Sequence, residues 1–486
     1  MMDWLRYNAQ QYPHRLCINE YSYEQVYHWA IYTAQWLQPQ LENTQRIAVL
    51  SDNSAVMAIH MLAAMLLHKE ILLLNVHLKQ NELENQLQQL GVNIVLCSEK
   101  RQHQLPMSVH IIPFMDVVEW TEVTAIGGDC QEIETVADIF DWNFADTDIA
   151  AIMNTSATTG QFKSVPLRWG QIKAHVTASQ EVLGKTDDDN WLMVLPLFHV
   201  SGLSILMRSL YNGTAMTIMA SYDEEVVLKL IEEKRINMMS LVPTILQRLE
   251  PRIMHHQLRV ILLGGEFIPR PLVDACVAKE LPIYKTYGMT ETFSQSVTMS
   301  VLDNLDKIDS VGTPLPGMKV HIVNPDIDGI GEIHLNGPML MTGYIGKEPI
   351  HGDFNTDDIG YIDDEGYLYI LNRRTDLIIS GGENIYPKEI EDLLYAHELV
   401  KECAVLPVTD LKWGQVPVLF VALQNKYVGE SAHTILSELH QYMLGHLAKY
   451  KVPKTIHILD RLPRNGTGKI VRRELQELAE QGVGHE

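Results

Sequence analysis

Short hydrophobic runs rich in β-branched residues alternate with stretches of helical periodicity up to about residue 312. The most apolar stretch, 55–67, predicts a buried helix, because it is too short to span a bilayer. An amphipathic pattern such as that at 226–234 also predicts a helix. Strands and helices in alternation predict a layered α/β fold. The runs that predict buried parallel strands are 47–50, 92–96, 191–195 and 260–263.

After residue 312 the pattern changes. Runs at 320–323 and 331–335, separated by Asn-Pro and Asp-Gly turns, predict an antiparallel sheet or a small barrel. A further run at 367–371 ends in the charged, turn-prone sequence Asn-Arg-Arg-Thr-Asp. Beyond it, a compact α+β unit is expected, with strands at 403–407 and 418–423 and a helix at 432–447. We therefore place a large domain at 1–374 and a small one at 376–486, while 100–146 is acidic and poorly patterned.

Composition and charge narrow the function. The 486 residues are 46% hydrophobic and 20% charged, as in ordinary globular proteins, and Lys+Arg 38 against Asp+Glu 61 gives a net charge of −23. A chain this acidic does not present the positive electrostatic potential that binding to nucleic acid or an anionic membrane requires. An anionic substrate must therefore be met by local lysines, backbone N–H groups and metal. The expected partners are small molecules, and a homo-oligomer stays open.

The cysteines are scattered and odd in number, without CxxC spacing, which argues for a reducing compartment and against zinc or a disulfide framework. The opening Met-Met-Asp-Trp-Leu-Arg has no basic stretch before an apolar run, so no signal peptide is expected there. The predicted location is the cytoplasm. The five cysteines are Cys17, Cys97, Cys130, Cys276 and Cys403.

Two loops of small polar residues each end in a lysine. The first runs from Asn154 to Lys163, and the second reads Asn-Gly-Thr-Gly and ends at Lys469. Either loop alone would be read as a surface turn. Together, and so far apart in sequence, they suggest a nucleotide enclosed between two domains.

The series of motifs resembles the adenylate-forming superfamily of acyl-CoA ligases, peptide-synthetase adenylation domains and luciferases. The resemblance covers nearly the whole chain and keeps the family's order. It implies a small C-terminal domain that is mobile about a hinge at Thr375, and a β-barrel-like region at the end of the large domain. The motifs are 155–160 with Lys163, 287–292, 356–358, 373–382 and 466–469.

Activation of a carboxylic acid requires its carboxylate to attack the α-phosphate of ATP, so positioned cations and N–H donors are the main need. The resemblance implies that Lys163 supports the phosphates, that Thr290 contacts the α-phosphate and that Lys469 bridges it to the carboxylate. Glu291 would be the protein ligand of Mg²⁺, which suits a lone carboxylate with phosphates and waters. Read locally, Thr-Glu would be a helix N-terminus. The implied phosphate-loop donors are Ser156, Thr158, Thr159 and Gly160.

The nucleoside contacts are implied in the same way. Asp358 and Arg373 resemble the pair that binds the ribose, although locally each is only a charged turn or hinge residue. The segment Gly264-Gly265-Glu266 fits the loop beside the adenine, and Tyr287 and Gly288 open the central motif.

A second half-reaction with coenzyme A is implied by two features. Gly381 and Gly382 leave room for a thin pantetheine arm. Trp413 resembles the tryptophan that stacks on the CoA adenine, with a packed core tryptophan as the alternative. In the family, the small domain rotates between half-reactions, so that Lys469 leaves the site and the glycine loop enters it.

The acyl pocket is implied by 195–203, in which His199 guards the acid. Ser201, Ser204 and Arg208 follow at i, i+3 and i+7, on one face of a helix begun near Gly202. An arginine among apolar residues needs a partner, which is a structural carboxylate, the solvent or the substrate. The resemblance favours the substrate, because it is closest to a branch of acyl-CoA ligases whose acid carries a second carboxylate.

Three positions depart from the family pattern. Ala157 and Asp357 replace glycines, and Phe162 replaces a proline. A positive φ at 157 or 357 would strain a non-glycine residue by roughly 1–2 kcal/mol and would affect the affinity for ATP. Alternatives to the leading hypothesis are a general aromatic or medium-chain acyl-CoA ligase, an enzyme that loads a carrier protein, and a non-catalytic binder of acyl-adenylates or CoA esters.

Overall fold

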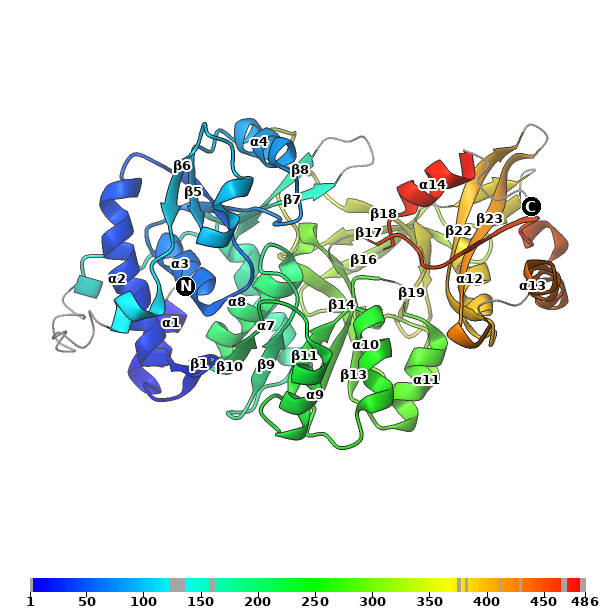
Figure 1. Cartoon of the computed structure of the whole chain (residues 1–486), viewed down its shortest axis with the longest axis horizontal. Helices are drawn as coiled ribbons and strands as arrows, with labels where there is room; N and C mark the ends of the chain where they lie inside the picture. The colour runs from blue at the N-terminus through cyan, green and yellow to red at the C-terminus, as the bar shows by residue number, and fades with distance from the viewer. Residues whose placement is uncertain are drawn as a thin grey trace.

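The structure, a computed structural model, describes residues 3–121, 136–156, 162–266, 268–373, 377–380, 383–410, 413–427, 431–464 and 470–480. Two large sheets and an antiparallel sheet form the bulk of the molecule, and the small C-terminal unit lies at one end of its long axis (Figure 1). None of the described helices is long and apolar enough to cross a membrane.

The first large sheet has six strands in the order β6-β5-β3-β4-β7-β8. All neighbours are parallel except β7 and β8, which form an antiparallel hairpin. The parallel strands predicted at 47–50 and 92–96 are confirmed as β3 and β5, and they are neighbours. The stretch 100–146, in which no element was predicted, adds the edge strand β6. The bounds are β3 Arg46–Leu50, β4 Glu70–Leu73, β5 Ile94–Cys97, β6 His110–Pro113, β7 Ile149–Ser156 and β8 Phe162–Arg168.

The second large sheet has nine strands in the order β15-β14-β13-β12-β11-β9-β10-β1-β2. Its centre, from β13 to β10, is parallel, which confirms the strands predicted at 191–195 and 260–263. The bounds are β1 Leu16–Ile18, β2 Tyr21–Ser22, β9 Asn190–Met193, β10 Ala215–Ile218, β11 Met238–Leu241, β12 Val260–Gly264, β13 Ile283–Met289, β14 Ser294–Ser300 and β15 Thr313–Pro314.

Helix α7 contacts β8 of one sheet and β14 of the other, so it lies between them, with α8 packed against it and against β9, β10 and β14. The predicted buried helix is α3, whose side chains are almost all inaccessible. The bounds are α1 Asp3–Gln11, α2 Tyr23–Leu41, α3 Ala55–Leu66, α4 Gln80–Gln89, α7 Trp169–Leu183, α8 Val200–Asn212, α9 Glu224–Glu232, α10 Pro243–Leu249 and α11 Arg270–Ala278.

The region after residue 312 forms an antiparallel sheet in the order β16-β17-β18-β19, and a second α+β unit follows it. That unit begins with a hairpin, carries helices beside a mixed sheet, and has a separate core. Its helix α12 contacts β19 and α11 of the large domain. The bounds are β16 Lys319–Val323, β17 Gly331–Asn336, β18 Phe354–Ile362, β19 Leu368–Arg373, β20 Ile378–Ser380, β21 Glu383–Ile385, α12 Pro387–Tyr395, β22 Val400–Asp410, β23 Gly414–Leu423, α13 Ala432–His446, β24 Thr455–Leu459 and α14 Arg472–Glu480.

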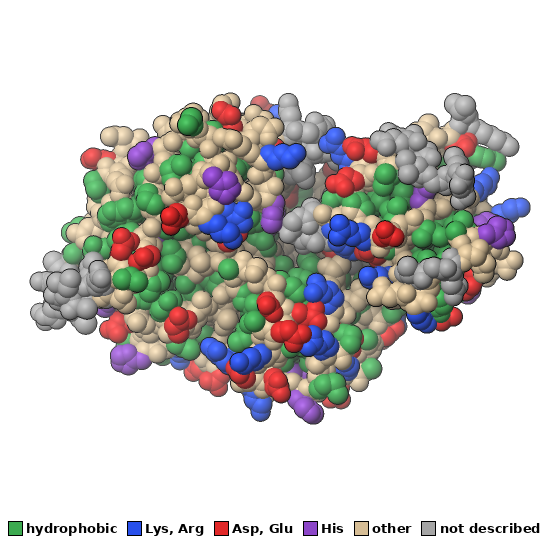
Figure 2. Space-filling view, viewed as in Figure 1, with side chains coloured by type: hydrophobic (Ala, Val, Ile, Leu, Met, Phe, Trp, Pro, Cys, Tyr) green, Lys and Arg blue, Asp and Glu red, His purple; other side chains and the backbone are tan. Residues whose placement is uncertain are grey.

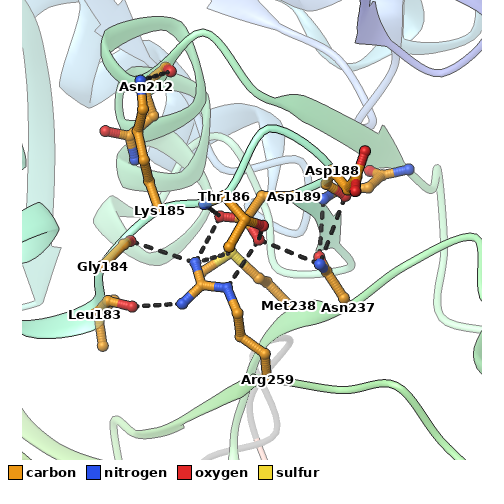
Figure 3. A network of polar contacts seen from close by, with 11 residues as sticks. Leu183, Gly184, Lys185, Thr186, Asp188, Asp189, Asn212, Asn237, Met238 and Arg259 are labelled. Atoms are coloured by element: carbon orange, nitrogen blue, oxygen red, sulfur yellow. Dashed lines mark hydrogen bonds and ion pairs between the residues drawn. The ribbon is translucent and has the colours of Figure 1, made fainter.

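A buried carboxylate ties α7 to the start of three strands (Figure 3). Asp189 is 2% exposed and accepts hydrogen bonds from Arg259 Nε at 2.8 Å and from the Thr186 hydroxyl at 2.7 Å. Asn237 Nδ2 donates to it at 3.1 Å. Burial raises the pKa of this carboxyl, but the hydrogen bonds and the Arg259 charge outweigh burial and lower it overall. The network fixes the end of the large sheet opposite the candidate site.

Candidate active site

The candidate site lies at the carboxyl ends of the central strands β12 and β13, where open parallel sheets place their ligands. The loop Gly264-Gly265-Glu266 leaves β12 directly, as the sequence predicted, and Gly265 has φ +84°, which favours glycine. β13 ends in the central motif, and a single 3-10 turn at Thr290–Thr292 follows it. The helix N-terminus that Thr290 and Glu291 would suggest locally is therefore wrong.

The two residues implied for the ribose lie opposite each other. Asp358 on β18 is the direct cross-strand partner of Arg373 on β19, whose side chain lies outside the described part of the chain. Asp358 is 6% exposed, and Tyr287 donates its hydroxyl to Asp358 Oδ2 at 2.6 Å. Tyr287 and Asp358 come from different sheets, so this contact brings the second and third motifs together.

Asp357 has φ +60°, a positive value at which a non-glycine residue is strained. Its N–H donates to Asn355 Oδ1 at 2.8 Å, and the next N–H donates to Thr356 Oγ1 at 3.1 Å. These bonds hold the turn that a glycine would otherwise adopt freely. Ala157 lies outside the described residues, and Phe162 begins β8.

Glu291 is held from three directions. Its carbonyl accepts from the Met341 N–H at 2.8 Å and from Gln171 Nε2 at 3.0 Å. Its Oε1 accepts from the Tyr344 hydroxyl at 2.8 Å. Burial and the charge of Glu291 raise the pKa of Tyr344, so Tyr344 stays a donor. One carboxylate with a fixed orientation fits Mg²⁺ that takes its other ligands from phosphates and water.

Tyr344 was missed by the sequence reasoning, since it lies far from Glu291 in the chain and belongs to no motif. Lys163 Nζ lies 5.2 Å from the centroid of its ring, so one tyrosine contacts both a phosphate-loop lysine and the carboxylate implied for the metal. Nearby, Gly288 permits the close approach of β13 and β14, because a Cβ there would lie 1.5 Å from Ser294 O.

The residues implied for the acyl pocket lie on and just before α8. His199 is the N-cap of this helix, and its ring lies 4.9 Å from that of Phe198. Ser201 is in the first turn and is half-buried, whereas Ser204 and Arg208 are buried. The helix predicted from the serine and arginine spacing is confirmed.

Arg208 is 1% exposed and faces neutral groups. Its Nη1 donates to Gln295 Oε1 at 2.6 Å and its Nη2 to Ser204 Oγ at 3.1 Å, and its guanidinium carbon lies 4.3 Å from the Trp191 ring centroid. Burial lowers its pKa to about 9. Among the described residues, no carboxylate pairs with it. Both structural alternatives, a protein carboxylate and an exposed head group, are therefore wrong for the described part of the chain.

Of the residues implied for CoA, Trp413 is described, and it lies in the small domain. Trp413 is 42% exposed, so the alternative of a packed core tryptophan is wrong. Its neighbour Gly414 pairs with Ser380, the last residue of β20 before the Gly381-Gly382 loop. Trp413 therefore lies close to the strand that leads into this loop.

Several implied residues lie outside the described residues, but their flanks are placed. Strands β7 and β8 bracket the phosphate loop. A bridge between Arg464 and Ile470 brackets the loop that ends at Lys469. Arg464 Nη1 lies 3.7 Å from Glu266 Oε1. The base of the C-terminal loop thus contacts the candidate adenine loop. The residues concerned are Thr158, Thr159, Gly160, Thr375, Gly381, Gly382 and Lys469, with the side chain of Ser156.

Comparisons with known proteins agree with this geometry. The model of the AMP-binding enzyme family matches residues 5–345, and that of the AMP-binding enzyme C-terminal domain matches residues 389–469. A 2-succinylbenzoate–CoA ligase of Lactococcus lactis is 48% identical over 98% of this chain and 100% of its own length. One from Bacillus cytotoxicus is 36% identical over 99% of both.

The chain is also similar to solved structures. The chain is similar to o-succinylbenzoate CoA synthetase of Bacillus subtilis in complex with its acyl-adenylate OSB-AMP, with a TM-score of 0.84 at 34% identity over 97% of both chains. Against a double mutant of that enzyme bound to the product analogue OSB-NCoA, the TM-score is 0.69 at the same identity, over 98% of both chains. As a whole, this chain is therefore more similar in structure to the adenylate complex than to the complex with the product analogue.

Proposed function

Because the chain belongs to the AMP-binding enzyme family, we propose that it is an ATP-dependent o-succinylbenzoate–CoA ligase, an acid–thiol ligase that works through an acyl-AMP. This ligase belongs to menaquinone synthesis, and its family is the one to which the sequence motifs showed the closest resemblance. The observation that carries the substrate assignment is Arg208, a buried cation without a described carboxylate partner on the helix that follows His199. The substrate has two carboxylates, and only the succinyl one is activated. The ring carboxylate is the anion that would complete Arg208.

In the first half-reaction, an oxygen of the succinyl carboxylate attacks the α-phosphorus of ATP, and the bond to pyrophosphate breaks. Thr290 and Lys469 contact the α-phosphate, and Lys163 and the 156–160 loop hold the others. Asp358 and Arg373 hold the ribose. Glu291 would hold Mg²⁺, which supplies charge neutralisation at the phosphates.

In the second half-reaction, the CoA thiolate attacks the acyl carbon and AMP leaves. Gly381 and Gly382 would admit the pantetheine arm, and the indole of Trp413, which is 42% exposed, suits stacking on the CoA adenine. Thr375 is the hinge about which the small domain exchanges these loops.

A release assay tests the function. Pyrophosphate release and thioester formation are measured with o-succinylbenzoate, benzoate, medium-chain fatty acids and no acid, each with and without CoA. We expect pyrophosphate with o-succinylbenzoate in both cases and a thioester only with CoA. A preference for fatty acids would leave a general acyl-CoA ligase, and no pyrophosphate with any acid would leave a binding protein.

The role of Lys469 is tested separately. Lys469→Ala removes the cation that aligns carboxylate and phosphate, so adenylation should fall by roughly a hundredfold or more. Thioester formation from preformed acyl-AMP and CoA should survive. Equal losses in the two half-reactions would contradict this assignment.

The partners proposed are these small molecules, with no nucleic acid and no stable membrane association. A cytoplasmic location is proposed from the cysteines, of which the four described are free and buried. On the face in Figure 2, Lys and Arg side chains lie singly or in small groups among acidic ones. This mixture suits a chain of net charge −23 that meets its anions only inside the site.

A further inference from the structure

Gln295, on β14, is completely buried and directly contacts the guanidinium of Arg208. We propose that Gln295 is a positioning residue that holds Arg208 without neutralising its charge, and so determines selectivity for an acid with a second carboxylate. This inference rests on the function proposed above and deepens it, since it names the group that keeps the cation available.

The orientation of the Gln295 amide is fixed by its neighbours. Its Oε1 receives two donors, Arg208 Nη1 at 2.6 Å and Ser179 Oγ at 2.8 Å. A guanidinium only donates, so the oxygen must face it. The Nε2 group donates to Thr298 Oγ1 at 3.0 Å. The amide is therefore held at both ends, and Arg208 is placed by a rigid acceptor on a strand.

His175 on α7 completes the surroundings of Gln295. Its Nε2 accepts from the Gln295 N–H at 3.2 Å, so the proton of the neutral ring is on Nδ1. Burial, and secondly the charge of Arg208, hold the pKa of His175 well below its usual range. The ring is completely buried and meets Phe293 edge-on at 5.1 Å. No second charge therefore arises beside Arg208 from this side.

The group that accepts from Arg208, the side-chain amide of Gln295, carries no charge. A carboxylate in place of the amide would form a closed ion pair with Arg208, whereas an amide oxygen leaves the positive charge uncompensated. Ser204 and the face of Trp191 are likewise neutral. Within the described residues, Arg208 Nε and His175 Nδ1 have no hydrogen-bond partner although both are buried. A buried donor without an acceptor costs free energy, and an anionic ligand that accepts from Arg208 would remove that cost there.

The variant Gln295→Glu tests the inference, because it keeps the size of the side chain and supplies the missing carboxylate. Two acids are compared in acid-dependent ATP–pyrophosphate exchange: o-succinylbenzoate, and 3-benzoylpropionate, which lacks the ring carboxylate. The parent enzyme should prefer o-succinylbenzoate by about a hundredfold or more in kcat/KM. In Gln295→Glu, the KM for o-succinylbenzoate should rise by about that factor. The kcat and the KM values for ATP and 3-benzoylpropionate should stay within about threefold.

The outcomes separate the two claims. If the parent enzyme shows no preference between the acids, the proposed substrate fails and the inference fails with it. If the parent discriminates and Gln295→Glu discriminates equally well, the function stands and the role of Gln295 is overturned. A merely structural role would lower kcat with both acids alike.

A second variant keeps the test decisive if the first does not fold. Gln295→Met removes the acceptor without adding charge, so Arg208 stays cationic but is no longer held. The KM for o-succinylbenzoate should rise by about tenfold, and that for 3-benzoylpropionate should not change. Equal changes in both KM values would overturn the proposal.

Discussion

At the scale of single residues, candidate site residues could be predicted where they belong to a sequence motif. They could not be predicted where the fold brings distant residues together. Asp358 and Glu291 are proposed as site residues from their motifs, and the positive φ considered at Asp357 is present at +60°. The contacts of Tyr344 with Glu291 and of Gln295 with Arg208 were not predicted. A tyrosine or glutamine that orients another side chain has no sequence signal of its own, because its partner is set by tertiary packing.

Arg208→Ala should remove the cation that binds the second carboxylate. We expect a loss of about 3–5 kcal/mol in transition-state binding, which is at least a hundredfold in kcat/KM for o-succinylbenzoate. Turnover of 3-benzoylpropionate serves as the internal control and should change little. Normal turnover of o-succinylbenzoate by Arg208→Ala would refute the substrate assignment.

Tyr344→Phe should weaken the hold on the metal while keeping the ring near Lys163. The lost hydroxyl donates to Glu291 Oε1 at 2.8 Å, and such outer-shell bonds typically cost about tenfold or more in metal affinity. The Mg²⁺ concentration for half-maximal adenylation should therefore rise about tenfold. Tyr367→Phe is the matched control, since that hydroxyl donates to Asn304, on the segment that follows β14. An unchanged Mg²⁺ requirement in Tyr344→Phe would count against Glu291 as the ligand.

At the scale of elements, hydrophobic periodicity located the central strands and α8 to within a few residues, because their buried faces leave a clear pattern. It could not give the pairing of Asp358 with Arg373, since register depends on a turn and a bulge between β18 and β19. It also missed β6, a short edge strand in an acidic segment. Nor did it foresee the network at Asp189, whose partners Thr186, Asn237 and Arg259 come from three separate segments.

Asp189→Asn should destabilise the large domain in a pH-dependent way. The folded pKa of this carboxyl is lowered below its unfolded value, so its contribution is fully present above pH 4 to 5 and is lost as pH falls through the folded pKa. At pH 7 the variant should be less stable by about 3 kcal/mol, because a buried ion pair is broken. The difference should shrink toward pH 3. Denaturant unfolding followed by tryptophan fluorescence measures it, with the exposed neighbour in Asp188→Asn as the control. A difference independent of pH would contradict the charge argument.

At the scale of the whole molecule, the sequence indicated two domains and their order, but not their relative orientation. Hydrophobic periodicity predicts the secondary structure of each domain, whereas the relative orientation of the domains depends on a few contacts that any rotation must break. One of these is Lys388 on α12, whose Nζ donates to Ile370 O on β19 at 2.7 Å across the boundary between the domains. Burial lowers the pKa of Lys388, with a carboxylate, Asp392, one turn away as its nearest compensating charge.

Lys388→Met should therefore loosen the arrangement that resembles the adenylate complex. The buried bond to Ile370 is lost, while the aliphatic stem is kept, so the small domain should spend less time with Arg464 beside Glu266. We expect the single-turnover rate of acyl-AMP formation to fall by about three- to tenfold. Thioester formation from preformed acyl-AMP should be unchanged or faster. Lys451→Met is the matched control, because Lys451 pairs with Glu389 inside the small domain at 2.7 Å. If both half-reactions slow together in Lys388→Met, the contact supports folding of the small domain and not its orientation.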